Sequence, residues 1–129
     1  MGKRIRIKTE SFTGDAELRE SPTARALWRS LPVEGLANIW GREVYFQIPV
    51  DAELEDDARE TVDKGEIAYW PMGQAFCIFC GPTPASRGEE IRAYSPVNIL
   101  GRLLVEPAVF RNVQDGERIV LEKLNSQDL

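Results

Sequence analysis

Residues 75–80, with the sequence Ala-Phe-Cys-Ile-Phe-Cys, are apolar at every position and have the composition of a β-strand. Successive side chains of a strand point to opposite faces, so this strand would present an apolar surface on both sides. An antiparallel sheet usually leaves one face polar and open to water. Something must therefore cover the second face. The candidates are a helix near residues 22–31, a loop such as residues 82–92, or a ligand in a shallow apolar pocket.

The two cysteines of the chain, Cys77 and Cys80, lie in this run. Three residues apart in a strand, they point to opposite faces and are separated by about 10 Å along it. A disulfide needs Cα atoms within about 7 Å of each other, so these two residues are not expected to form one or to share a metal ion. A zinc site would need further ligands, and the chain has no histidine and no other cysteine. We predict two free, buried thiols and no metal site.

The composition indicates a single globular domain over residues 1–129. A chain of this length, 43% hydrophobic and 29% charged, can bury one core without disulfides or metals. Its net charge of -5 disfavours binding to nucleic acid or to an anionic membrane. No apolar run is long enough for a membrane span, and no signal-peptide core follows the N-terminus. We expect a cytoplasmic protein.

The absence of histidine removes the commonest catalytic groups at neutral pH, including Ser-His and Cys-His pairs. Any catalysis would depend on carboxylates, Arg, Lys, Tyr, Cys or a cofactor. Paired carboxylates with a spacing suited to acid/base chemistry are not evident. We predict no cofactor.

Alternating apolar residues and turn signals divide the rest of the chain into short strands. Ser21-Pro22 opens a helix that ends before Pro32, because Ser is a good N-cap and Pro is favoured at the first helical position. The acidic run 51–57 is expected to be a solvated loop or a short helix, and a second short helix begins near Pro107. The expected strands are residues 3–9, 12–19, 33–40, 43–48, 65–70, 74–80, 97–105 and 116–124. This pattern predicts a mainly β, antiparallel barrel.

Several of these segments resemble known proteins. Two resemble the cyclophilin patterns Gly-Ser-Gln-Phe-Phe-Ile and His-Val-Val-Phe-Gly-Lys-Val, namely Gly73-Gln-Ala-Phe-Cys-Ile78 and Val97-Asn-Ile-Leu-Gly-Arg-Leu103. Four resemble the small prokaryotic cyclophilin-like proteins of unassigned function, namely Trp40-Gly-Arg-Glu-Val-Tyr-Phe46, Gly65-Glu-Ile-Ala-Tyr-Trp-Pro-Met-Gly73, Cys77-Ile-Phe-Cys-Gly81 and Ser95-Pro-Val-Asn-Ile-Leu-Gly101. The resemblance implies a closed, eight-stranded antiparallel barrel with one or two short capping helices.

Cyclophilins isomerise X-Pro bonds with an Arg that hydrogen-bonds near the prolyl amide and an apolar pocket for the ring, a chemistry that needs no His base. The resemblance makes Arg42 the candidate catalytic residue. By strand alternation, however, Arg42 shares a face with Phe46, toward the barrel interior. The family's pocket Gln and Phe fall on Ala75 and Cys77, and its Trp falls on Arg92. These departures disfavour ordinary prolyl isomerase activity.

The leading hypothesis is a binding protein without efficient prolyl isomerisation. A small molecule or a peptide segment would lie in an outer-face groove lined by Glu43, Tyr45, Gln47, Cys77 and Phe79. Three alternatives stay open. In the first, Tyr45 and Phe79 are simply packed under a neighbouring loop. In the second, Glu43 is a structural residue that hydrogen-bonds Ser95 or Asn98. In the third, the protein is an enzyme that uses either Arg42 or Glu43 with Tyr45. The sequence indicates neither the ligand nor the oligomeric state.

Overall fold

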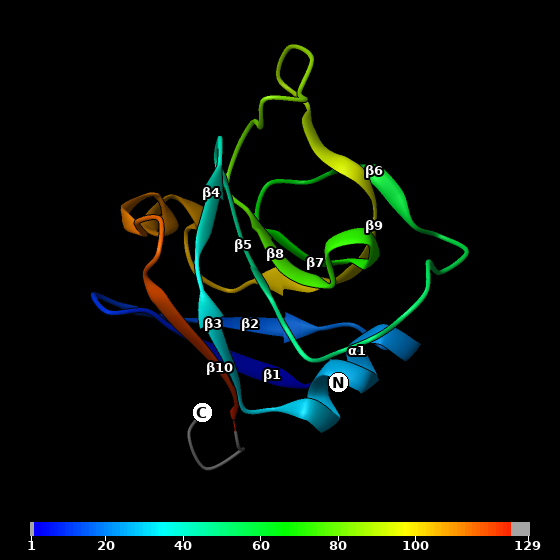
Figure 1. The fold of residues 1–129 in the computed structure, drawn as a ribbon, viewed down its shortest axis with the longest axis vertical. Helices are drawn as coiled ribbons and strands as arrows, with labels where there is room; N and C mark the ends of the chain where they lie inside the picture. The colour runs from blue at the N-terminus through cyan, green and yellow to red at the C-terminus, as the bar shows by residue number, and fades with distance from the viewer. Residues whose placement is uncertain (1, 125–129) are drawn as a thin grey trace.

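The computed structural model describes residues 2–124, which form a mainly β, antiparallel fold (Figure 1). Within this part of the chain the strands are β1 (Arg4–Lys8), β2 (Thr13–Leu18), β3 (Val33–Leu36), β4 (Asn38–Trp40), β5 (Glu43–Gln47), β6 (Arg59–Val62), β7 (Glu66–Trp70), β8 (Ala75–Phe79), β9 (Ile91–Leu103) and β10 (Arg118–Leu124). The helices are α1 (Pro22–Ser30) and two short 3-10 turns, η1 (Pro71–Gly73) and η2 (Pro107–Asn112).

The sheet is curled but not closed. Its hydrogen-bonded order is β3-β10-β1-β2-β9-β7-β8-β5-β4, and β6 pairs with β9 off this path. The expected closed, eight-stranded barrel is therefore wrong. The end strands of the path, β3 and β4, do not pair with each other because they follow one another in the chain with only Ala37 between them. Figure 1 shows the strands curving round a common interior, with α1 at one end of the molecule.

Ala37 explains why the predicted strand 33–40 is two strands. Its N–H donates to the carbonyl of Glu117 at 2.7 Å, and its carbonyl accepts from the N–H of Gly116 at 2.8 Å. The chain is thus held to the turn before β10 at this point. Before Ala37 it pairs with β10, and after it with β5. This division, together with the unexpected strand β6, raises the number of strands from eight to ten.

Helix α1 begins and ends where the sequence predicts. The Ser21 side chain accepts a hydrogen bond from the Ala24 N–H at 3.2 Å, and Pro22 occupies the first helical position. The buried face of the helix, with Ala24 and Leu27, packs on the main core. No helix within residues 2–124 is both long enough and apolar enough to cross a lipid bilayer.

The main core fills the inner face of the sheet between α1 and η2. Its largest fully buried side chains include Phe46, Phe76, Ile78, Leu27 and Phe110. Alternate residues of β1, β5 and β8 contribute to it, and so do Ile119 and Leu121 of β10, as strand alternation predicts. The inner face of the sheet is therefore filled mainly by side chains.

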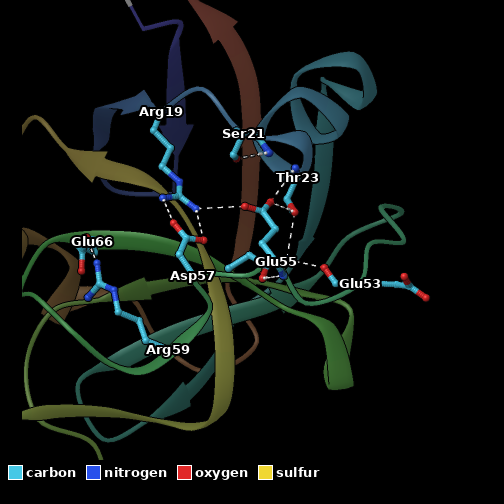
Figure 2. Close-up of polar contacts among 10 residues, drawn as sticks. Arg19, Ser21, Thr23, Glu53, Glu55, Asp57, Arg59 and Glu66 are labelled. Carbon is cyan, nitrogen blue, oxygen red and sulfur yellow. Dashed lines mark hydrogen bonds and ion pairs between the residues drawn. The ribbon is translucent and has the colours of Figure 1, made fainter.

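The acidic segment 51–57 is a loop that hydrogen bonds and ion pairs hold to the rest of the fold (Figure 2). Arg19 donates to both carboxylate oxygens of Asp57, at 2.7 and 3.1 Å, and to Glu55 at 3.2 Å. Glu55 also accepts from the backbone N–H of Thr23 at 3.0 Å and from its hydroxyl. The side chain of Asn98 accepts from the backbone N–H of Glu55 at 2.8 Å. Figure 2 shows the carboxylates of Glu55 and Asp57 in these contacts. They fasten the loop to Arg19 and to the start of α1.

Candidate functional site

Strand β8 has both faces buried, and its neighbouring thiols diverge as predicted. Cys77 belongs to an outer cluster and Cys80, just past the strand, to the main core, and both thiols are free. Burial raises the pKa of Cys77 well above its ordinary value and that of Cys80 to about 12. Neither thiol is therefore a nucleophile at neutral pH, because the reactive form is the thiolate.

The outer face of β8 is covered by strands. Residues 91–97, the first half of β9, leave the main sheet and pair with β6. Together they bury an outer core that consists of Val62, Ala68, Cys77, Phe79, Ile91, Ala93, Val97 and Ile99. Of the predicted covers, the helix at 22–31 packs on the other side of the sheet, and the loop 82–92 contributes only its last residues.

This cover is incomplete beside β4, β5 and β7, where it leaves a cavity of about 220 Å³. We call this cavity the aromatic pocket; it is lined by Trp40, Glu43, Tyr45, Trp70, Ala93, Tyr94 and Val97. The strand registers explain why these residues come together. Trp40 lies opposite Glu43, and Tyr45 follows on the same face. Trp70 projects from β7 on the same side, and β9 closes the pocket with Tyr94.

The four aromatic rings of the pocket form a continuous series of edge contacts. Trp40 and Tyr94 have ring centroids 6.0 Å apart at 68°, Tyr94 and Trp70 5.8 Å apart at 70°, and Trp70 and Tyr45 6.1 Å apart at 86°. These are favourable edge-to-face geometries. Successive rings turn by nearly a right angle, so that the series forms the walls of a box.

Trp70 is fixed in this box by two contacts. Its indole N–H donates to the hydroxyl of Ser95 at 2.6 Å. Gly73 lies so close to the ring that a Cβ at this position would overlap with it. The ring is therefore held from two sides before any ligand arrives, which lowers the ordering cost of binding.

Glu43 is the buried charge of the pocket, with only 5% of the residue exposed. Burial raises the pKa of its carboxyl group to about 7, partly opposed by a hydrogen bond from the Cys77 thiol. No Lys or Arg of residues 2–124 lies within ion-pair distance of this carboxylate. The anticipated structural partners Ser95 and Asn98 bond elsewhere, to Trp70 and to the loop 53–55.

The structure brings together only part of the predicted groove. Glu43 and Tyr45 line the aromatic pocket. Cys77 and Phe79 lie opposite them on β8 but are buried as members of the outer core, with 1% and 0% of their surface exposed. Gln47 is exposed at the end of β5 and does not line the cavity.

Arg42 lies in the turn between β4 and β5, and its side chain is exposed. The expected interior position is wrong because β5 begins at Glu43, so strand alternation does not extend to Arg42. Its backbone N–H donates to Pro82 at 2.9 Å, and its carbonyl accepts from Cys80 at 2.9 Å. It borders a second cavity of about 400 Å³ with Val44 and Phe110, and Glu43 lines both this cavity and the aromatic pocket.

Sequence reasoning missed Trp40, Trp70 and Tyr94 as pocket residues. Tyr94 was missed because the strand was expected to begin at residue 97, whereas β9 begins at Ile91. The alternation of apolar Ile91 and Ala93 with Arg92 and Tyr94 is the sequence signal for this earlier start. Among residues 2–124, no group of three or more His, Cys, Asp or Glu side chains is placed to hold a metal ion.

Residues 3–122 match the model of the cyclophilin-like family. The chain belongs to this family. A search of the curated proteins found no match. The cyclophilin-like assignment fits the segments singled out above, which lie between residues 40 and 103 of the matched region.

Two solved structures are similar to this cyclophilin-like chain. One is the solution structure of a hypothetical protein from Archaeoglobus fulgidus, with 40% identity over 95% of both chains and a TM-score of 0.82. The other is McbB in complex with tryptophan, with 17% identity and a TM-score of 0.72. That match covers 95% of this chain but 45% of McbB, so the chain spans less than half the length of McbB. At this identity the likeness to McbB shows the fold alone.

Proposed function

We propose that this cyclophilin-like protein is a binding protein whose aromatic pocket takes a small molecule or one side chain of a peptide. The observation that carries the proposal is the pocket itself, in which four aromatic rings and a buried carboxylate meet in one cavity. Apolar walls with a few convergent polar groups and a strongly shifted pKa are the usual signs of a ligand site.

The size of the pocket limits what it accepts. Its volume of about 220 Å³ is below the range of about 300–1,000 Å³ of typical small-molecule sites. It is nevertheless far larger than the space that one water needs. A head group or a single side chain fits, and the remainder of a larger ligand would lie over exposed Tyr94 at the rim.

Binding without catalysis agrees with the groups present. Among residues 2–124, Glu43 is the one carboxylate that lines the pocket, and no second acid or base lines it except the tyrosine hydroxyls. The nearby thiols are protonated at neutral pH. McbB was solved with tryptophan, but the fold alone is shared, so tryptophan serves here only as a probe.

Tyr94→Ala is expected to weaken binding by about tenfold, because it removes one wall of the box. The side chain is 68% exposed, so the variant should fold normally. The measurement is calorimetric titration with three probes: choline, tryptophan and an acetylated lysine-containing tetrapeptide. Leu36→Ala, on β3 and 63% exposed, is the matched control and should bind as the wild type does. The proposal fails if no probe binds the wild type, or if Tyr94→Ala binds them equally well.

A second candidate function, prolyl isomerisation with Arg42, is favoured by one observation. Arg42 borders a cavity that Val44, Phe110 and Val113 line together with Glu43, so a donor lies beside apolar side chains that could hold a ring. Against it, Arg111 lines the same cavity and adds a second positive charge. We rank this candidate below ligand binding because, among residues 2–124, Phe110 is the one aromatic residue on the walls of this cavity, and Arg42 is held in a turn mainly by backbone bonds.

The isomerase candidate is tested with a proline-containing chromogenic tetrapeptide in a protease-coupled assay. Wild type and Arg42→Ala are both expected to give the uncatalysed rate. Arg29→Ala, an exposed arginine on α1, controls for loss of a surface charge. A wild-type rate well above background that falls in Arg42→Ala but not in Arg29→Ala would establish the isomerase instead.

A further inference from the structure

The rings of the aromatic pocket present the kind of surface that attracts positive charge. The face of an aromatic ring carries partial negative charge, and Trp and Tyr are the stronger cation-binding rings. The pocket has two of each, turned by 68° to 86° from one ring to the next, so that a group inside meets several rings from different directions. An apolar ligand would bind equally well against any apolar side chains. A cation, in contrast, is attracted specifically to Trp and Tyr rings.

Glu43 adds a second, independent observation. It is 95% buried, lines the pocket, and has no cationic partner among residues 2–124. Its neighbour on β8 is the Cys77 thiol, a weak donor that hydrogen-bonds the carbonyl of Ala75 at 3.9 Å. A buried carboxylate without a counter-ion is costly, and such groups are normally paired. Arg42 and Arg111 line the neighbouring cavity that Glu43 also borders, but neither forms an ion pair with it, so a ligand in the aromatic pocket can supply a closer counter-ion.

Resting on the proposed function, we propose that the pocket binds an organic ammonium cation, with Glu43 as its counter-ion and Trp40, Tyr45, Trp70 and Tyr94 as its walls. The cation is a methylated amine rather than a primary one. A primary ammonium carries three N–H donors, and Glu43 is the only strong acceptor on the walls. The hydroxyls of Tyr45 and Tyr94 are weaker acceptors than a carboxylate, and the hydroxyl of Ser95 already accepts from Trp70. Methyl groups, in contrast, suit rings and the small apolar side chains of Ala93 and Val97.

Protonation of Glu43 gives the proposal a pH signature. The titratable groups around it are the Cys77 thiol from β8, Tyr45 from its own strand and Tyr94 from β9. On its other side, Arg42, Cys80 and Arg111 line the neighbouring cavity that Glu43 also borders. The thiol stays neutral, since burial raises its pKa well above the ordinary value. With a pKa of about 7 in the free protein, Glu43 must lose its proton before it can pair with a cation. Affinity for the cation should therefore rise by about tenfold per pH unit below pH 7 and level off above it.

The test compares choline with 3,3-dimethylbutan-1-ol, a neutral molecule of the same shape, by calorimetric titration at pH 8. Choline is expected to bind at least about tenfold more tightly than the alcohol, and Glu43→Gln is expected to remove this preference. Glu89→Gln, an exposed carboxylate, is the matched control and should keep it. A third ligand, acetyl-trimethyllysine methylamide, separates the sources: tighter binding than choline indicates a protein side chain, and weaker binding a free amine.

The ammonium assignment and the binding pocket itself fail in different ways. Equal affinity for choline and the neutral alcohol, or a preference that survives Glu43→Gln, would overturn the ammonium assignment but leave the pocket as a binding site. Binding of tryptophan without binding of choline would do the same. If none of these probes binds, the proposed function itself fails. Choline affinity that does not change between pH 5.5 and pH 8 would also contradict the pairing with Glu43.

Discussion

Glu43→Gln is expected to raise the free energy of unfolding by about 2–3 kcal/mol at pH 8 and to leave it nearly unchanged at pH 4. The folded protein holds the proton of Glu43 up to a pKa of about 7, whereas the unfolded chain loses it at about the ordinary value of 4.5. Between these values the folded state binds more protons than the unfolded state. Stability therefore falls as pH rises through this window and is lowest above pH 7. Glutamine has no proton to lose and avoids this cost.

The measurement is urea unfolding of wild type and Glu43→Gln at half-unit steps from pH 4 to pH 8. Other groups act with the opposite sign: the Arg19 side chain lowers the pKa of Asp57, and that of Arg92 lowers the pKa of Glu90. Both pairs are present in the two variants, so the difference curve isolates Glu43. Exposed Glu89→Gln should track the wild type. Parallel curves for wild type and Glu43→Gln would show that the carboxylate is not buried at a cost.

Such a result would bear directly on function. If Glu43 destabilises the protein at neutral pH, one substitution removes that destabilisation. A residue of this kind is typical of a site that is kept for binding rather than for stability. Glu43→Gln should thus be more stable and at the same time lose its preference for cations. A merely structural glutamate would show stability and binding falling together.

Gly101→Ala is expected to destabilise the protein by about 3 kcal/mol or more. A Cβ at this position would overlap with the carbonyl oxygen of Glu17 and lie 2.9 Å from the Cα of Leu18. Both of those atoms belong to the backbone of β2, which pairs with β9 at this point. Backbone cannot rotate away as a side chain can, so β2 and β9 would have to separate. Thermal and urea unfolding measure the effect.

Gly88→Ala is the matched control for this prediction. Gly88 has a φ of 65°, but no atom lies within 4 Å of the place that a Cβ would take, so it tests backbone conformation without crowding. Its cost should be near the ~1 kcal/mol of a left-handed non-glycine residue. Equal losses in the two variants would mean that the close contact between β2 and β9 contributes little to stability.

The elements that sequence predicted correctly have local causes. The start of α1 is set by the Ser21 cap and Pro22, and the divergence of the two thiols by strand alternation alone. The split at Ala37 and the strand β6 have non-local causes. Ala37 is fixed by bonds to residues 116 and 117, and three of the four residues of β6 are exposed, so its sequence resembles a polar loop. Neither could be inferred without the fold.

The candidate site divides in the same way. Glu43 and Tyr45 could be assigned to one face because they alternate along a single strand. Trp70 and Tyr94 reach them only through the register of β7 on β8 and the path of β9 over the outer core. Cys77 and Phe79 were rightly placed on that face, but the strand that covers them was not foreseen. The pocket exists because the cover formed by β6 and the first half of β9 ends beside β4, β5 and β7.

The most direct test of the account uses the three tryptophans of the chain, Trp28, Trp40 and Trp70. Trp40 and Trp70 line the aromatic pocket, whereas Trp28 lies on α1 between the amines of Lys3 and Lys123, at 5.4 and 5.1 Å from its ring. Each tryptophan gives one indole N–H signal in a ¹⁵N-correlated NMR spectrum, so Trp28 is an internal control. On titration with choline at pH 8, the signals of Trp40 and Trp70 should shift and saturate together while that of Trp28 stays in place. Movement of Trp28 alone, or no movement of any of the three at millimolar choline, would contradict the account.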